Sequence, residues 1–240
     1  MDYLGKADKR QRGQDRGEMP LQSTMYQKQK IDISAAPWLM HEFFAGSGLV
    51  AYGLKEMFAP VWANDISEQK TAVYEANFGC DRFILDDIKN IKGSILPFAH
   101  LSWASFPCQD LSLAGSIGGI HASRSGLIWE WLRVLDEMDN KPKLLLLENV
   151  AGLLSTNGGD SYRVLHPALV ECGYCCGAVL LNASYFVPQS RPRVFIIAVQ
   201  EDYSILGELA GNGPCWLHNN AATQLGRERP GWVWWHTEKP

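Results

Sequence analysis

Two reactive side chains follow apolar runs that are typical of buried strands. Cys108 lies in Phe106-Pro107-Cys108-Gln109, directly after one such run, and Glu148 follows another that begins at Lys143. A thiolate is a strong nucleophile, and a carboxylic acid can donate a proton to a reacting group. A packed structural thiol is the alternative for Cys108. Reactive groups at the ends of two neighbouring strands favour a shared catalytic site.

Two arginines enter the last apolar run at alternate positions. They belong to Gln189-Ser190-Arg191-Pro192-Arg193, which precedes residues 194–199. Side chains two residues apart in an extended segment point the same way, so Arg191 and Arg193 are expected to project together into one cleft. Their guanidinium groups would bind phosphate or a carbonyl oxygen there. Two solvated surface arginines are the alternative.

A glycine-rich turn joins the first apolar run to a helical pattern. Gly46, Gly48 and Ala51 fit G-x-G-x-x-G/A, and Asp65 stands at the end of the second strand candidate. This pattern predicts a nucleoside-containing cofactor, with ribose hydroxyls on the Asp65 carboxylate, but it does not separate NAD from S-adenosylmethionine. Asp87 is placed either to reach an adenine amino group or to cap a helix.

Strand-like and helix-like segments alternate along the chain and must position these residues. Because strands such as Leu144–Leu147 are wholly apolar, we expect a doubly wound α/β fold with a mostly parallel sheet. The last two strands have no helix between them and should pair antiparallel. Ligands bind beyond the carboxyl ends of strands in such sheets. The expected strands are 39–43, 61–64, 82–85, 101–105, 143–147, 175–182 and 194–199, and the expected helices are 49–58, 67–78, 127–139 and 162–172.

Composition excludes several classes of protein. The 240 residues are 46% hydrophobic with a net charge of −4, which excludes wholesale disorder and a generally basic nucleic-acid coat protein. No apolar run reaches the roughly 20 residues of a membrane helix, and no export signal is visible, so we expect a soluble cytoplasmic protein. The pair Cys172 and Cys175 forms a C-x-x-C, which we interpret as structural thiols rather than a redox or zinc site.

As a set, these motifs closely resemble one family, the C5-cytosine DNA methyltransferases. Phe44-Ala45-Gly46-Ser47-Gly48 is similar to its cofactor loop, Pro107-Cys108-Gln109 to its catalytic motif, and Glu148-Asn149-Val150 to its acid motif. Gln189-Ser190-Arg191-Pro192-Arg193 is similar to its Q-x-R-x-R motif. The resemblance covers about residues 39–199. Leu49 and Ile66 depart from it, since the family often has glycine and an aromatic residue there.

The resemblance implies a class I S-adenosylmethionine-dependent methyltransferase fold and a mechanism. Cys108 would add to C6 of a flipped cytosine, Glu148 would donate to N3, and C5 would then attack the methyl group of S-adenosylmethionine. Asn149 would fix the turn at Cys108, Arg193 would contact the cytosine O2, and Arg191 would support it or bind phosphate. The implied cofactor-binding residues are Phe44, Ala45, Gly46, Ser47, Gly48, Asp65, Ile66, Asp87, Ile88 and Pro107.

The resemblance also implies surroundings and domain boundaries. We expect double-stranded DNA as partner, no metal, no membrane, a monomer, and a nucleoid-associated bacterial or phage protein of a restriction-modification or related methylation system. Residues 1–36 are expected to be a disordered tail, since they carry seven Lys/Arg against five Asp/Glu and few large apolar residues. Residues 37–200 would form the catalytic domain, and 201–240 the start of an incomplete target-recognition region.

Alternatives remain for the tryptophans near the end of the chain and for the function as a whole. Trp232, Trp234 and Trp235 would either form a binding surface or pack on a part of the protein outside these 240 residues. An NAD-dependent oxidoreductase would explain the glycine turn but leave Cys108 and Glu148 without roles. A tRNA cytosine-5 methyltransferase of the same fold is the second alternative, and an inactive remnant is the third.

Overall fold

The computed structural model describes residues 30–107, 126–203 and 206–240. Its centre is a seven-stranded sheet in the order β3-β2-β1-β4-β5-β7-β6. Each paired strand is parallel to its neighbour except β7, which is antiparallel to both β5 and β6. The doubly wound sheet with an antiparallel last hairpin is therefore confirmed. The strands are β1 (Trp38–Phe43), β2 (Phe58–Asp65), β3 (Phe83–Leu85), β4 (Leu101–Ala104), β5 (Leu144–Val150), β6 (Tyr174–Asn182) and β7 (Pro192–Gln200).

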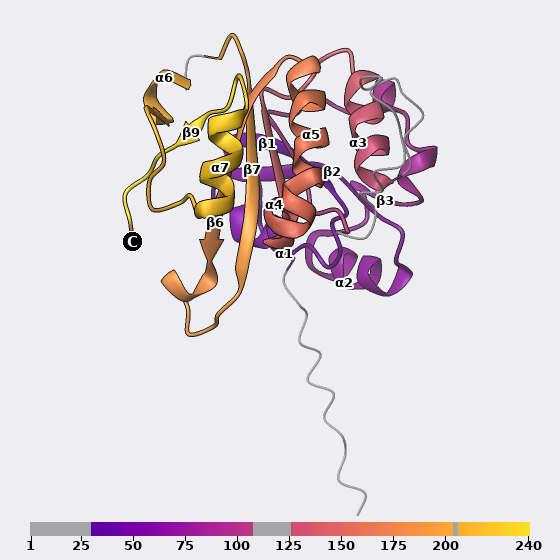
Figure 1. Cartoon of the computed structure of the whole chain (residues 1–240). Coiled ribbons are helices and arrows are strands. Elements are labelled where there is room, and N and C mark those ends of the chain that lie inside the picture. Colours follow the sequence, from indigo (N-terminus) through magenta and orange to yellow (C-terminus); the bar gives the residue numbers. More distant parts are fainter. Residues whose placement is uncertain (1–29, 108–125, 204–205) are drawn as a thin grey trace, which may run out of the picture.

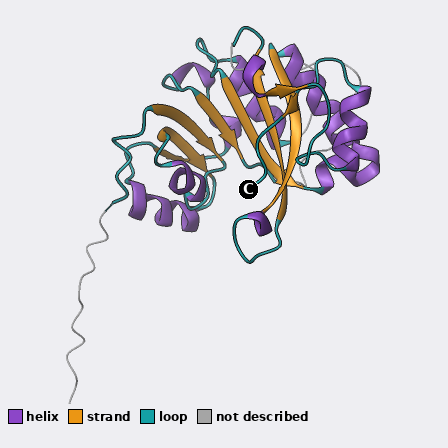
Figure 2. Cartoon of the chain, turned by 90° about the vertical axis from the view of Figure 1, so that its left-hand side faces the viewer, coloured by secondary structure: helices purple, strands orange, loops and turns teal. Residues whose placement is uncertain are grey.

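Helices cover both faces of this sheet. Successive side chains of each strand point to opposite faces, so apolar side chains on both faces are available to pack against helices. On one face, Phe43, Ala104 and Leu147 pack against α3 (Leu127–Asp136) and α5 (Asp160–Glu171), which stand in front of the sheet in Figure 1. On the other face, Met40 and Leu101 pack with α1 (Leu49–Leu54) and α2 (Glu68–Phe78). Figure 2 shows the twist of the sheet between its helices. The short helices are α4 (Gly152–Ser155), η1 (Ile88–Asn90), η2 (Gly93–Ile95), η4 (Thr156–Gly159) and η5 (Ala183–Tyr185).

The expected helix over 49–58 is too long. Helix α1 ends at Leu54, and β2 already begins at Phe58, so one apolar run holds the end of a helix and the start of a strand. The register of β1 against β2 shifts between Met40 and His41, beside Pro60. Proline has no N–H to give to the sheet, which fits a local irregularity there. Gly53 lies inside the last turn of α1 and not after it, and periodicity alone therefore missed the boundary.

The C-terminal segment packs on the sheet and on α5, which sequence reasoning did not foresee. Trp235 is 4% exposed, and its Nε1 donates to the Ile197 carbonyl at 3.1 Å. Trp232 stacks on His166 at an interplanar angle of 13°. The interpretation that these tryptophans pack on a part of the protein outside the 240 residues is corrected, because Trp232 and Trp235 have packing partners within this chain. The segment contains α6 (Leu206–Leu209), β8 (Ala210–Gly211), α7 (Asn220–Glu228) and β9 (Trp234–Trp235).

The described chain also continues before β1. The Ile31 N–H donates to the Asn77 carbonyl at 2.8 Å, and Ile33 is buried. Thus Ile31 contacts α2 and Ile33 is packed, although both residues fall within the expected tail. Within the described ranges, no helix has the length and apolar character that crossing a membrane requires.

Candidate functional site

The site residues gather at one edge of the sheet. The carboxyl ends of β1, β2, β4 and β5 meet there, and the antiparallel β7 starts at the same edge, where Val150 pairs with Arg193. Parallel strands bring their carboxyl ends together, and one reversed strand adds its first residues to them. Residues that are far apart in the sequence therefore face a common space.

The glycine-rich loop makes a tight turn that only certain residues allow. Phe44, Gly46 and Gly48 all have positive φ angles, of 56°, 57° and 82°. A Cβ at Gly48 would lie 2.7 Å from the Phe78 ring, so this glycine permits close packing of the loop on α2. Phe44, Ala45, Gly46 and Ser47 line a cavity, whereas Gly48 does not.

Asp65 holds this loop through its carboxylate. One oxygen accepts from the Gly46 N–H at 2.8 Å, and the other accepts from the Ser67 N–H at 2.9 Å. The side chain is buried but still lines a cavity. Each carboxylate oxygen has a second lone pair, so Asp65 can anchor the loop and still accept a bond from a ligand.

A small cavity of about 190 Å³ lies beside Asp65. The Asp87 carboxylate accepts from the Lys89 N–H at 3.0 Å, which caps η1, and Asp87 also lines the cavity. Both roles considered for this residue are thus compatible. Ile66 is 69% exposed and lends the cavity an apolar wall. The full lining is Phe44, Asn64, Asp65, Ile66, Lys70, Asp86, Asp87, Ile88, Ser105, Pro107 and Leu127.

A larger cavity of about 720 Å³ joins the glycine loop to the last hairpin. Glu148, Arg191 and Arg193 line it together with Phe44 and Gly46. Cavities of this size commonly hold small molecules or cofactors. The sheet therefore places the predicted acid and both predicted arginines at the wall of the same cavity as the glycine loop.

Glu148 and Arg193 form an ion pair across β5 and β7. The Arg193 Nε lies 2.9 Å from Glu148 Oε1, and each side chain is less than a quarter exposed. The Arg193 Nη1 donates to its own Pro192 carbonyl at 2.8 Å, which fixes the guanidinium. This arrangement offers both a carboxylate oxygen and guanidinium N–H groups to a polar ligand.

Asn149 ties β5 to the turn after β4. Its Nδ2 donates to the Phe106 carbonyl at 3.0 Å, and its Oδ1 accepts from the Val150 N–H at 2.9 Å. The first bond fixes the residue before Pro107, which itself lines the small cavity. Cys108 comes next in the chain and lies outside the described residues, as does the rest of the segment 108–125.

Several lining residues escaped sequence reasoning. Leu127 begins α3 at the small cavity, while Lys70 of α2 and Ser105 after β4 line both cavities. Ser105 accepts a bond from the Trp103 Nε1 at 2.7 Å. A serine as the last residue of the expected strand 101–105 was a usable signal for Ser105. Lys70 shows no such signal, because its place depends on how α2 packs.

Burial changes the ionisation of two neighbours on β1. Burial raises the pKa of Glu42 to about 8, although a 3.4 Å bond from the Ala51 N–H opposes this shift. Burial also lowers the pKa of His41 to about 4. Glu42 Oε2 has no hydrogen-bond partner among the described residues. The Glu42 carboxyl is thus protonated near neutral pH, and it accepts a hydrogen bond from Ala51 in the first turn of α1, next to the glycine loop.

Two of the described cysteines outside the site, Cys172 and Cys176, have the character of packed thiols. Burial raises the pKa of Cys172 to about 11 and that of Cys176 to about 12. Such thiols are poor nucleophiles near neutral pH. Over residues 30–107, 126–203 and 206–240, no group of three or more histidine, cysteine, aspartate or glutamate residues is placed to hold a metal ion.

Comparison with known proteins agrees with this geometry. The family described as C-5 cytosine-specific DNA methylase matches residues 39–224. The Type II methyltransferase M.Bsp6I of Bacillus sp. (strain RFL6) is 35% identical over 159 residues, which are 64% of this chain and 50% of that protein. The Type II methyltransferase M.HhaI of Haemophilus parahaemolyticus is 32% identical over 166 residues, covering 68% of this chain and 50% of its own.

Solved structures show the same fold. The Dnmt2 methyltransferase of S. pombe superposes with a TM-score of 0.57 at 23% identity, covering 71% of this chain and 55% of its own. A DNA modification methyltransferase encoded within an E. coli prophage gives a TM-score of 0.56 at 22% identity, covering 70% and 49%. The chain spans about half the length of the curated relatives it matches. Because the family match extends over most of the chain and over every strand of the central sheet, this chain belongs to the C-5 cytosine-specific DNA methylase family.

Proposed function

We propose that this chain transfers a methyl group from S-adenosylmethionine to C5 of cytosine in DNA. The observation that carries this proposal is the convergence at one sheet edge of the Glu148–Arg193 pair, the Asn149-anchored turn that leads to Cys108, and the glycine loop. An oxidoreductase would need the glycine loop but not the other two features. The curated relatives are named as Type II methyltransferases, which favours DNA as the substrate and a restriction-modification system as the context.

The two cavities suit the two halves of the cofactor. Asp65, Asp87 and Ile88 would hold adenosine in the small cavity, with Ile66 and Pro107 as apolar walls. The glycine loop would hold the amino-acid half at the edge of the large cavity. When bound there, S-adenosylmethionine supplies an electrophilic methyl group on its sulfonium.

Cytosine would occupy the remainder of the large cavity, beside Glu148 and Arg193. The Cys108 thiolate would form a bond to C6, and Glu148, which must carry a proton for this step, would donate that proton to N3. The electron pair displaced from the C5–C6 double bond then becomes available at C5. C5 would take the methyl group, and the electron pair of the broken S–CH3 bond would stay on the cofactor sulfur. A base would then remove the C5 proton, the electrons of the C5–H bond would re-form the C5–C6 double bond and expel Cys108 as the thiolate, and the N3 proton would return to Glu148. Arg193 would stabilise the cytosine O2. A cytosine stacked in a duplex cannot reach this cavity, so the base must be flipped out.

Covalent trapping tests the nucleophile. With DNA that contains 5-fluorocytosine, the C5 fluorine cannot leave as a proton does, so the enzyme remains attached and a single turnover suffices. We expect an adduct with the wild-type chain and with the control Cys80→Ser, since Cys80 is an exposed thiol of the loop before β3. Cys108→Ser should form none. An adduct with Cys108→Ser would refute the assignment, and trapping on tRNA but not on DNA would reassign the substrate.

A further inference from the structure

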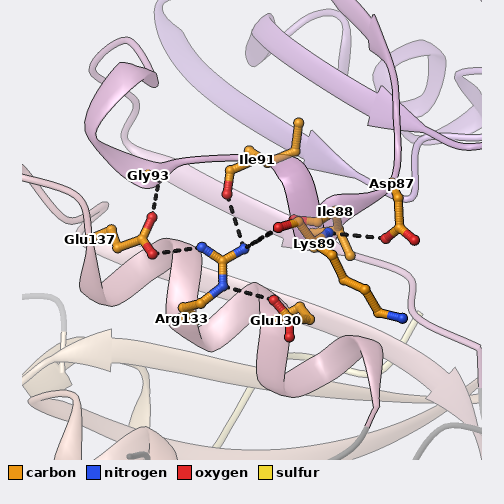
Figure 3. Close-up of polar contacts among 8 residues, drawn as sticks. All are labelled: Asp87, Ile88, Lys89, Ile91, Gly93, Glu130, Arg133 and Glu137. Carbon is orange, nitrogen blue, oxygen red and sulfur yellow. Dashed lines mark hydrogen bonds and ion pairs between the residues drawn. The ribbon is translucent and has the colours of Figure 1, made fainter.

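A single arginine of α3 binds the loop that follows β3 (Figure 3). The Nη2 of Arg133 donates to the Ile88 carbonyl at 3.2 Å, to the Lys89 carbonyl at 3.4 Å and to the Ile91 carbonyl at 3.0 Å. These carbonyls lie in and just after η1, and the Ile88 carbonyl also accepts from the Ile91 N–H at 3.1 Å. One guanidinium therefore satisfies the carboxyl end of η1.

Two carboxylates hold this guanidinium in place. Glu130 accepts from the Arg133 Nε at 2.8 Å, and Glu137 accepts from its Nη1 at 2.6 Å. The second oxygen of Glu137 accepts from the Gly93 N–H at 2.9 Å. Arg133 and Glu137 thus both bind the backbone of the loop, so residues 88–93 are hydrogen-bonded to the end of α3 at several points (Figure 3).

The contact at Gly93 is too close for any side chain. A Cβ at this position would lie 2.0 Å from the Val134 carbonyl oxygen. The loop backbone therefore rests directly on the α3 backbone. With Arg133 at one end and Gly93 at the other, the separation of η1 from α3 is fixed.

Both elements reach the small cavity at their opposite ends. Asp87 and Ile88 line it from η1, and Leu127 lines it from the first turn of α3. Arg133 does not line the small cavity itself. Its bonds nevertheless set the distance between two walls of that cavity, because they join the elements that carry those walls.

We propose that Arg133 is a positioning residue for the nucleoside part of the cofactor. It acts through η1, whose amino end is capped by Asp87 and whose carboxyl end it binds itself. This inference rests on the proposed function, in which the small cavity holds adenosine. Exposed ion pairs contribute little to stability, so the directional bonds to the carbonyls are the part of this arrangement that matters.

The test is calorimetric titration of the 240-residue chain with S-adenosylmethionine. Arg133→Met keeps the aliphatic stem and removes every donor, and we expect binding to weaken roughly 3- to 30-fold, the range for residues that act without touching the ligand. The matched control is Arg163→Met, because Arg163 of α5 is similarly exposed, pairs with Glu228 and donates to the Gly158 carbonyl of η4. Its affinity should equal that of the wild type even where both variants melt at lower temperature.

A double-mutant cycle with Asp87→Ala separates positioning from general destabilisation. If Arg133 acts by placing Asp87, then Arg133→Met should weaken binding less in the Asp87→Ala background than in the wild type. Fully additive losses, or unchanged affinity of Arg133→Met, would overturn the inference. If Arg133→Met does not fold, Arg133→Lys replaces it, with a smaller loss expected and wild-type affinity as the overturning result.

A nucleoside probe and one further variant distinguish the two proposals. 5′-Methylthioadenosine lacks the amino-acid half, so Arg133→Met should weaken its binding by the same factor. If Asp65→Ala weakens S-adenosylmethionine binding but Arg133→Met does not, only the inference about Arg133 fails. If the wild-type chain binds neither ligand, the proposed cofactor site fails, and the inference fails with it.

Discussion

At the scale of single residues, polar side chains of the site already form hydrogen bonds with the protein backbone. Asp65 binds two backbone N–H groups, and Asn149 binds the Phe106 carbonyl. Hydrogen bonds from charged groups contribute more than neutral ones, and a buried donor that loses its acceptor costs about 1–3 kcal/mol. Removing one of these side chains therefore changes the stability of the loop as well as the affinity for the ligand. Each variant needs a second, more conservative variant that separates these two effects.

Asp65 gives the first such prediction. Asp65→Ala should weaken S-adenosylmethionine binding by about 10- to 150-fold, from the roughly 1.5–3 kcal/mol of bonds to a charged group. It should also lower the melting temperature, since the Gly46 and Ser67 N–H groups lose their acceptor. Asp65→Asn keeps one acceptor oxygen and should lose less of both. Calorimetry that found Asp65→Ala and wild type equal in affinity would contradict the assignment.

Glu42 gives a prediction about pH. Its pKa of about 8 in the folded state exceeds the ordinary value of 4.5, so the folded protein keeps a proton that the unfolded chain has lost. Stability should therefore fall as pH rises between these values. Over pH 6.5–8, above the ordinary pKa of histidine, Glu42 should account for a loss of about 1.5 kcal/mol.

Glu42→Gln checks this prediction, because it keeps an acceptor for the Ala51 N–H and cannot ionise. Its unfolding free energy, measured by urea denaturation, should fall by about 1.5 kcal/mol less over pH 6.5–8 than that of the wild type. The matched control Glu75→Gln, on α2, should follow the wild-type profile. Parallel profiles for wild type and Glu42→Gln would show that Glu42 is already ionised in the folded protein.

At the scale of elements, the C-terminal segment completes the core on the β6 side. Val233 and Trp235 join Val179, Val199 and Leu217 in one cluster. Gly177 of β6 allows this approach, since a Cβ there would lie 1.9 Å from the Val233 carbonyl oxygen. The segment 206–240 is thus held by the same sheet that carries the site.

Removing one tryptophan tests how firmly this segment is held. Trp235→Ala should lower the free energy of unfolding by about 3–5 kcal/mol, the usual cost of deleting a buried aromatic side chain. The control Trp38→Ala, at a position 47% exposed, should cost far less. A loss for Trp235→Ala in urea denaturation as small as the one expected for Trp38→Ala would mean that the segment contributes little to the core.

At the scale of the whole molecule, we expect the net charge to limit the DNA binding that we propose. The chain carries a net charge of −4. Affinity for DNA depends on how many phosphates lysine and arginine neutralise. Of the two cavity arginines, Arg193 is paired with Glu148, whereas no described carboxylate forms an ion pair with Arg191. We therefore expect weak binding and slow methylation by the 240-residue chain.

The salt dependence of DNA binding measures this limit. Arg191→Gln should lower the slope of log K against log salt by about 1, the effect of losing one phosphate contact. The control Lys143→Gln should leave the slope unchanged, because Lys143 precedes β5 at the opposite edge of the sheet and pairs with Asp202. Fluorescence anisotropy with a labelled duplex provides the measurement. An unchanged slope in Arg191→Gln would remove Arg191 from the DNA-binding surface, and rapid tritium transfer to DNA would contradict the expected slow methylation.

The sequence by itself determined the order of the motifs, the alternation of strands and helices, and the antiparallel final hairpin. Those features are local, since an apolar run such as Leu144–Leu147 and a glycine turn such as Gly46–Gly48 specify their own conformation. They sufficed to place Glu148 and Arg193 at the carboxyl edge of the sheet. They also sufficed to identify the family.

Only the tertiary structure decided which of these residues touch. The Glu148–Arg193 pair depends on the register of β5 against β7, and the contacts of Arg133 depend on how α3 lies against a loop more than forty residues earlier. The packing of Trp235 on β7 is of the same kind. Periodicity tells which face of an element is apolar, but it does not tell which distant backbone groups that face will meet. Those contacts are determined only when the whole core packs, because the side chains of all the elements must fill one shared volume.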